Sequence, residues 1–325
     1  MNTATPRDAQ DRLRWMLLAL VLAAACVLPF VVSNYRVFQL TLALVYAIAL
    51  LGLNMLTGYN GQISLGHGAF YAIGAYVAAI LMDKFGVPYW ATVPAAGAVC
   101  LLAGFLFGLP ALRLEGLYLA LATFALGVAM PQLLKYKHLE AWTGGVQGIV
   151  LIKPAAPFGL PLNEDQWLYL FSLFVAVVMF FIAHNLLQSG SGRAMRAIRD
   201  HAMAAEAMGV DNSHYKAMTF GVSAAFTGVG GALSAIAVQF VAPDSFTLFL
   251  SISLLVGIVV GGVGTLYGAI FGAIFIMFVP SLAEKVSKAA PWAVYGVVLI
   301  IFMFVMPGGV VGLLRKIQAR FGRAG

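Results

Sequence analysis

The chain has 325 residues, of which 62% are hydrophobic and only 10% charged, and its mean hydropathy is +0.94. A water-soluble domain carries about 25% charged and about 45–50% apolar residues, so this composition excludes a soluble globular protein and predicts one embedded in a lipid bilayer. The formal net charge of +7 does not indicate nucleic-acid binding, because the basic residues form short clusters between apolar runs and not one continuous face.

Apolar runs long enough to cross a bilayer recur along the whole chain. A transmembrane helix needs about 20 mostly apolar residues. The runs that approach this length cover residues 15–32, 39–56, 64–82, 90–109, 117–134, 167–187, 217–240, 246–263, 266–282 and 292–314. Because some runs are short or rich in glycine, the number of spans lies between about eight and ten. The predicted fold class is an all-α polytopic integral membrane protein.

The distribution of Lys and Arg predicts the orientation, because loops rich in these residues stay in the cytoplasm. With ten spans, the three richest basic clusters lie in residues 1–14, 188–216 and 315–325, all on one side. The sequence therefore predicts a cytoplasmic N-terminal tail, a transmembrane domain over residues 15–314 and a cytoplasmic C-terminal tail. The loop at 188–216 interrupts the domain on the cytoplasmic side.

The first apolar run has an alternative interpretation as a cleaved signal peptide. Arg12 and Arg14 precede it, and Ala23, Ala24 and Ala25 resemble a cleavage site. Cleavage would leave nine spans and an external N-terminus. Because the run stays apolar to residue 32, we expect it to be retained as a span.

Glycines and polar residues interrupt the apolar pattern between residues 54 and 68, and four glycines within eleven residues weaken a helix there. Irregular backbone at membrane depth is tolerated only where it is buried in protein or lines a water-filled cavity. The segment is either a broken element that lines a substrate pathway or an ordinary cytoplasmic turn in which His67 is merely hydrogen-bonded. The pathway candidates are Asn54, Gly58, Tyr59, Asn60, Gly61, Gln62, Ser64, Gly66, His67 and Gly68.

The basic loop after residue 188 predicts a short amphipathic helix over residues 191–209. Its apolar stripe, at helical spacing, comprises Met195, Ile198, Ala202 and Ala205. Ser191 is placed to cap the start of the helix, and Gly209 is placed to end it. Such a helix either lies among lipid headgroups or docks into a groove on a partner protein. The small Ala and Met side chains favour the groove.

Several expected signatures of catalysis are missing from the sequence. It has no phosphate-binding loop of the type Gly-x-x-x-x-Gly-Lys-Ser/Thr, and no ionisable side chain is placed deep in a predicted span, as proton relays require. Cys26 and Cys100 have no metal-ligand spacing. We therefore assign no catalytic residue, cofactor or metal site.

A series of motifs follows in order from about residue 39 onward. They are Gly52-Leu53-Asn54 through Gly68-Ala69-Phe70, Gly74-Ala75-Tyr76, Arg113-Leu114-Glu115-Gly116, Thr143-Gly144-Gly145, Arg196-Ala197-Ile198-Arg199-Asp200, Ala204-Ala205-Glu206-Ala207-Met208-Gly209, Gly261-Gly262-Val263-Gly264-Thr265 and Met306-Pro307-Gly308-Gly309. With these motifs the chain resembles the membrane permease subunits of branched-chain amino acid ABC importers, of the LivM type.

The resemblance implies that the helix in the 188–216 loop is a coupling helix, which docks into a cleft on an ATPase subunit. Met203 stands where the family pattern Glu-Ala-Ala-x-x-x-Gly has its Glu, so Glu206 or the arginines would have to supply the salt bridge. The candidates for ATPase coupling are Arg193, Arg196, Arg199, Asp200, Ala204, Ala205, Glu206 and Gly209.

The resemblance also implies ATP-driven uptake of branched-chain or other hydrophobic amino acids across the bacterial cytoplasmic (inner) membrane. The implied partners are a second, LivH-like permease, two ABC ATPase subunits and an external substrate-binding protein. Urea, short amides and aromatic acids are alternative substrates for the same machinery. A self-contained channel or secondary transporter is the alternative class, and a purely structural subunit is a third.

Overall fold

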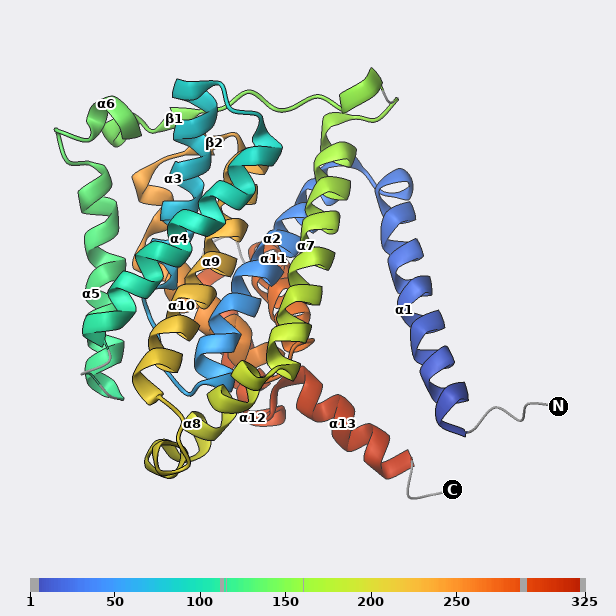
Figure 1. Ribbon diagram of the computed structural model, residues 1–325. Helices are drawn as coiled ribbons and strands as arrows, with labels where there is room; N and C mark the ends of the chain where they lie inside the picture. Colours follow the sequence, from blue (N-terminus) through green and yellow to red (C-terminus); the bar gives the residue numbers. More distant parts are fainter. Residues whose placement is uncertain (1–5, 112–113, 115, 160, 287–290, 322–325) are drawn as a thin grey trace.

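The computed structural model describes residues 6–111, 114, 116–159, 161–286 and 291–321. The ends of both predicted tails lie outside these residues, as do Arg113 and Glu115. The described chain is a bundle of long helices with a small sheet at one end (Figure 1). In this part of the chain nine helical segments are long and apolar enough to cross a membrane. The all-α polytopic class and the range of eight to ten spans are thereby confirmed.

Each predicted apolar run from the second to the ninth contains one long helix. In chain order the helices are α1 (Pro6–Val31), α2 (Asn34–Asn54), η1 (Met55–Tyr59), α3 (His67–Phe85), α4 (Tyr89–Ala111), α5 (Leu117–Leu134), α6 (Glu140–Thr143), η2 (Gly145–Gln147), η3 (Pro157–Gly159), α7 (Glu164–Gln188), α8 (Gly190–Ala207), α9 (Asn212–Val238), η4 (Pro243–Phe246), α10 (Leu248–Gly261), α11 (Gly268–Val286), α12 (Pro291–Val305) and α13 (Gly309–Phe321). Strands β1 (Ile149–Val150) and β2 (Phe240–Val241) pair antiparallel, with Ile149 opposite Val241.

Helix α9 forms the centre of the bundle and packs against α2, α3 and α4. Small residues allow these helices to approach closely, as is usual in membrane bundles. A Cβ atom on Gly74 of α3 would overlap the backbone of Gly228 on α9, and one on Gly104 of α4 would overlap the side chain of Ala224. Because other helices surround α9, the hydrogen bonds made by its polar side chains are buried inside the bundle.

The last predicted span, 292–314, is not one helix. Helix α12 ends at Val305, and α13 starts at Gly309 after a turn that contains Pro307. Gly309 has φ +68°. A Cβ atom at this position would overlap the backbone of Gly262 in the loop between α10 and α11. Proline cannot continue the helical hydrogen-bond pattern, and glycine accepts the left-handed turn. The break turns α13 away from the bundle (Figure 1).

Helix α1 begins at Pro6, inside the predicted N-terminal tail, and not at residue 15. Proline is favoured in the first turn of a helix, which explains the earlier start. The helix leans away from the bundle (Figure 1) and is held near its other end. There the hydroxyl of Tyr169 and the amide of Gln166, both on α7, donate to the carbonyls of Ala25 and Pro29.

Candidate functional site

The polar segment between residues 54 and 68 breaks the helical structure. The π-helix η1 follows α2 directly, residues 60–66 have no regular structure, and α3 begins at His67. Gly61 has φ +76°, a conformation that other residues rarely adopt. The hydroxyl of Thr57 donates to the carbonyl of Gln62 at 3.1 Å and closes the turn. We call residues 55–66 the buried break.

The buried break reaches the middle of the bundle. Leu65 N–H donates to the hydroxyl of Thr123 on α5 at 3.0 Å, and Gly68 N–H donates to Ser251 on α10 at 2.9 Å. His67 meets Ser223, which lies about 16 Å along α9 from its first residue at a rise of about 1.5 Å per residue. Most of the irregular backbone is therefore enclosed by protein, whereas Gly61 and Ile63 are exposed and line a pocket.

A chain of hydrogen bonds fixes His67 at the upper end of the buried break. Ser223 donates to the carbonyl of Gly52 at 2.7 Å, so it accepts from His67 Nε2 at 2.6 Å. His67 Nδ1 is then the acceptor for the Ser64 hydroxyl at 2.8 Å. Since both ring nitrogens are engaged and His67 and Ser64 are fully buried, this histidine holds α2, α3 and α9 together.

The hydrogen bond from Leu65 N–H to the hydroxyl of Thr123 is expected to stabilise the protein. Replacing Thr123 with valine keeps the side-chain shape but leaves the partly buried N–H of Leu65 without its acceptor, which is expected to lower the free energy of unfolding by about 1–3 kcal/mol. The control is Thr92→Val, because the equally buried hydroxyl of Thr92 only donates to Tyr89 O within its own helix end. Equal thermal unfolding of the two detergent-purified variants would contradict this role of Thr123.

Asn54 ties the start of the buried break to the loop between α10 and α11. Its side-chain amide donates to the carbonyl of Thr265 at 2.7 Å and accepts from Gly264 N–H at 2.8 Å. Asn54 is 1% exposed. Gly58 lies against the same loop, where a Cβ atom would overlap Gly264. The start of the buried break and the loop between α10 and α11 are therefore directly connected.

Helix α8 is the predicted amphipathic helix and lies outside the bundle, at one end (Figure 1). We call this end of the molecule the α8 end. Met195, Ile198 and Ala205 are buried on the predicted stripe. The backbone of His201 departs from helical geometry, so the helix bends there, and His201 Nδ1 accepts from Ala204 N–H at 3.2 Å.

The two ends of α8 differ from the prediction in one respect. Its N-terminal flanking residue is Ser189, whose hydroxyl donates back to Leu186 O, so Ser191 does not cap the helix. Gly209 does end it, with φ +88° and open space around it. Helix α8 follows α7 almost without a linker, so Ser189 is both the residue after α7 and the residue before α8.

Arg199 joins α8 to the buried break. Its Nη1 donates to the carbonyl of Gly58 at 2.9 Å, across 141 residues of sequence. The Arg199 side chain also lies against Gly61, where a Cβ atom would come within 3.0 Å of its Cγ. The same guanidinium binds Asp200, with Nη2 at 2.8 Å from Oδ1. The structure thus brings two of the predicted segments into direct contact.

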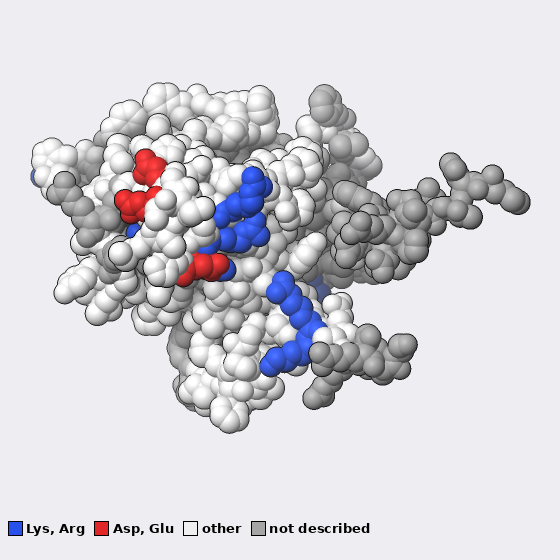
Figure 2. All heavy atoms as spheres, turned by 60° about the horizontal axis from the view of Figure 1, so that its bottom comes forward, with Lys and Arg blue, Asp and Glu red and all other residues white. Residues whose placement is uncertain are grey.

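The other predicted coupling residues lie on or after α8 without reaching the break directly. Arg196 donates to the carbonyls of Leu187 and Gly192, at the junction of α7 and α8. Glu206 accepts from the side chain of Asn212 at 3.2 Å. Ala205 is buried, and the other predicted residues of this set are exposed: Arg193, Asp200, Ala204 and Gly209. In the view with the α8 end turned forward, most of the visible basic side chains form two separate groups, and acidic side chains lie beside one of them (Figure 2).

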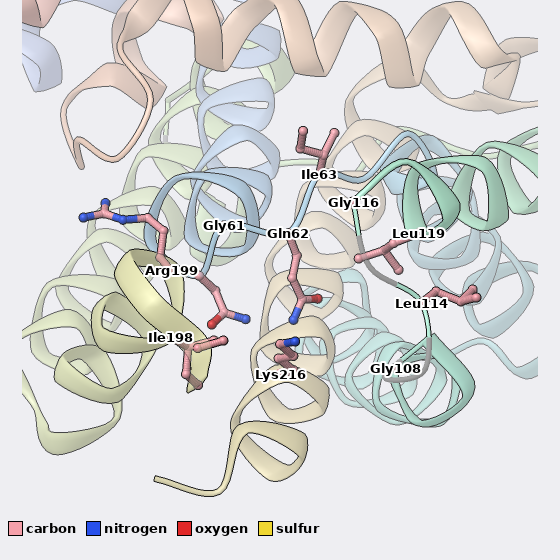
Figure 3. A pocket seen from close by; sticks show the side chains of 12 residues that line it. Gly61, Gln62, Ile63, Gly108, Leu114, Gly116, Leu119, Ile198, Arg199 and Lys216 are labelled. Carbon is pink, nitrogen blue, oxygen red and sulfur yellow. The ribbon is translucent and has the colours of Figure 1, made fainter. Parts of the chain in front are cut away.

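A cavity of about 190 Å³ lies between the buried break and α8. Gln62 reaches into it toward Lys216 of α9, and Ile198 of α8 forms part of the wall (Figure 3). Asn60 also lines this cavity and is 2% exposed, and its amide has no hydrogen-bond partner among the described residues. Because one wall belongs to α8, a displacement of this helix changes the cavity.

Sequence reasoning missed the partners that hold the buried break. The residues that could have indicated these partners are the buried hydroxyl residues of otherwise apolar helices, namely Thr123, Ser223 and Ser251. In the described residues, no group of three or more His, Cys, Asp or Glu side chains is placed to hold a metal ion.

The fold and the site together define a polytopic α-helical membrane protein with a polar break inside its bundle. A family model described as branched-chain amino acid transport system / permease component matches residues 35–306. This range is most of the chain, and the chain belongs to that family.

Relatives carry the same description. The chain is 37% identical over 255 residues to the "High-affinity branched-chain amino acid transport system permease protein LivM" of Escherichia coli (strain K12), and equally to that of Salmonella typhimurium. The match covers 71% of this chain but only 60% of those LivM proteins. The LivH permease protein of Escherichia coli (strain K12) is 24% identical over 212 residues, 59% of this chain and 67% of LivH. No solved structure gives a significant match.

Proposed function

We propose that the chain is the translocation subunit of an ATP-driven importer in the bacterial cytoplasmic membrane. Its proposed substrates are branched-chain or other hydrophobic amino acids, and the names of the LivM and LivH relatives specify branched-chain amino acids for those proteins. The observation that carries the proposal is the bond from Arg199 to Gly58. This hydrogen bond connects α8, which lies outside the bundle, to the buried break inside it. A partner protein that moves α8 can therefore act on the buried break.

The proposed partners are a second, LivH-like permease, two ABC ATPase subunits that hydrolyse ATP, and an external substrate-binding protein. The α8 end faces the cytoplasm in this proposal, since the basic clusters of α8 and α13 lie there and Lys and Arg favour that side. The N-terminus and the C-terminus are then both cytoplasmic.

In the proposed mechanism, ATP binding draws the ATPase subunits together and moves α8. Arg199 pulls on the carbonyl of Gly58, and Asn54 passes the displacement to the loop between α10 and α11. The polar groups of the buried break line the substrate pathway, with Gln62 and Asn60 at the cavity beside α8. No chemical step takes place on this chain.

The exposed apolar residues of α8 are proposed to contact the ATPase. Met203 is 78% exposed and follows the bend at His201. Ala205, in contrast, is 5% exposed and packs against the bundle, so a bulky residue there would test folding and not docking.

Met203→Gln is expected to weaken co-purification with the ATPase subunits about tenfold, since burial of one Met side chain contributes about 1.5–3 kcal/mol. Met16→Gln on α1, where Met16 is 60% exposed, is the matched control and leaves assembly unchanged. Equal retention of the ATPase by both variants would remove α8 from the interface.

The substrate is tested by uptake into proteoliposomes that contain the assembled complex. Leucine, isoleucine and valine are expected to accumulate with ATP and the binding protein present, and to compete with one another. Accumulation of urea, a short amide or an aromatic acid in their place would assign the machinery to the alternative substrates. Equilibration of solute by this chain alone would indicate a channel.

A further inference from the structure

A second pocket, of about 220 Å³, lies at the α8 end on the other side of the buried break. Its walls come from η1, α7, α8, the loop between α10 and α11, and α13. Two guanidinium groups, one imidazole and two phenols line it. These belong to Arg196, Arg315, His184, Tyr59 and Tyr267. Among the described residues, no carboxylate lines this pocket.

The two arginines come from different helices, Arg196 from α8 and Arg315 from α13, and both line the same small pocket. Arg196 is held in place by bonds from Nε to Gly192 O at 3.1 Å and from Nη2 to Leu187 O at 2.9 Å. A guanidinium has five N–H donors, so these two bonds leave others for a ligand. Like charges that meet without a carboxylate repel each other, and an anion between them removes the repulsion.

The elements that form the pocket also carry exposed apolar side chains. Ile182 on α7 is 46% exposed and Tyr267 is 57% exposed. On α13, Leu314 and Ile317 are each 42% exposed and alternate with the basic residues of the helix. Helix α7 ends beside the pocket after 25 mostly apolar residues, enough to cross the bilayer. The pocket therefore lies at the depth at which lipid headgroups meet protein.

We propose that this pocket binds the phosphate of an anionic phospholipid in the leaflet that faces α8. Arg196 and Arg315 would contact the phosphate oxygens as charge-assisted donors, with His184 and the phenols as further partners. The acyl chains would run along the exposed apolar side chains of α7. Basic pockets between helices at the membrane surface are suited to such headgroups. A lipid bound there would join α13 to the junction of α7 and α8, where the coupling helix begins.

The test compares two neighbouring charges on α13. Both side chains are exposed, but Arg315 lines the pocket and Lys316 does not. The full-length chain is delipidated and titrated with phosphatidylglycerol or phosphatidylcholine, and retained lipid is measured by native mass spectrometry. Arg315→Gln is expected to weaken retention of phosphatidylglycerol about tenfold, and Lys316→Gln to leave it unchanged. His184→Gln, a second pocket variant, is expected to weaken retention less than Arg315→Gln.

Equal losses in Arg315→Gln and Lys316→Gln would overturn the proposal, because they would indicate diffuse attraction to the basic face. Equal retention of phosphatidylcholine and phosphatidylglycerol by the unmodified chain would overturn it as well. Glycerol phosphate in a competition arm distinguishes the source of the phosphate. Failure of a tenfold excess to displace the lipid supports a lipid site, and full displacement assigns the pocket to a soluble phosphate.

Discussion

Replacing Arg199 with glutamine is expected to reduce ATP-dependent uptake about tenfold or more while the protein still folds and assembles. The substitution removes the donor to Gly58 O, a bond that a neutral side chain cannot replace at full strength. Hydrogen bonds to charged groups contribute about 1.5–3 kcal/mol, and about 1.4 kcal/mol corresponds to a tenfold change in rate. The side chain is 38% exposed, so its loss leaves no cavity in the core.

Arg193→Gln is the matched control, because Arg193 lies on the same helix with the same charge. The only hydrogen bond described for its side chain is a long one of 3.4 Å from Nη1 to Gln188 O at the end of α7. The readouts are uptake and substrate-stimulated ATPase activity of the same preparation. Arg199→Gln is expected to retain ATP hydrolysis but to lose uptake, which means uncoupling. Normal uptake by Arg199→Gln would contradict the proposed path from α8 to the buried break.

Replacing Asn54 with leucine is expected to destabilise the protein by about 2–5 kcal/mol. Leucine has the same number and branching of side-chain heavy atoms but leaves the partly buried Thr265 O and Gly264 N–H unpaired, and each unpaired group costs about 1–3 kcal/mol. Asn54→Asp keeps the acceptor for Gly264 but sets a carboxylate against the carbonyl of Thr265. It is expected to be at least as destabilising at neutral pH, since a buried charge needs a partner of opposite sign.

The control for Asn54 lies on the same helix. Gln39 is 7% exposed, and its amide nitrogen donates to the phenol of Tyr35 at 3.3 Å on the same helix. Gln39→Leu is therefore expected to change thermal unfolding little. A Gln39 variant as unstable as Asn54→Leu would show that any amide on α2 matters equally, and the specific link between η1 and the loop after α10 would be wrong.

The positions of the long helices follow from the sequence because lipid imposes a simple rule. Each apolar run that is long enough becomes a helix, and residues 117–134 were predicted with both ends at the observed residues. The errors occur where local backbone chemistry competes with hydropathy. Pro307 and Gly309 end a run that remains apolar on both sides, so hydropathy alone predicted a single helix at 292–314.

The composition of the sequence located the segments of the candidate site, but it did not predict which residues contact one another. Glycines and polar residues marked the buried break, and the periodicity of apolar residues marked α8. That Arg199 binds the carbonyl of Gly58 could not be inferred, since a backbone carbonyl carries no side-chain signal and lies 141 residues away. Likewise Ser223 accepts from His67 only because α9 passes through the centre of the bundle.

The most direct measurement is leucine uptake into proteoliposomes that contain both permease chains, with the ATPase subunits either present or omitted. The mechanism predicts accumulation against a gradient only when the ATPase subunits and ATP are both present, and loss of that accumulation in Arg199→Gln. Accumulation at the same rate without the ATPase subunits would contradict it, because the work would then come from elsewhere than α8.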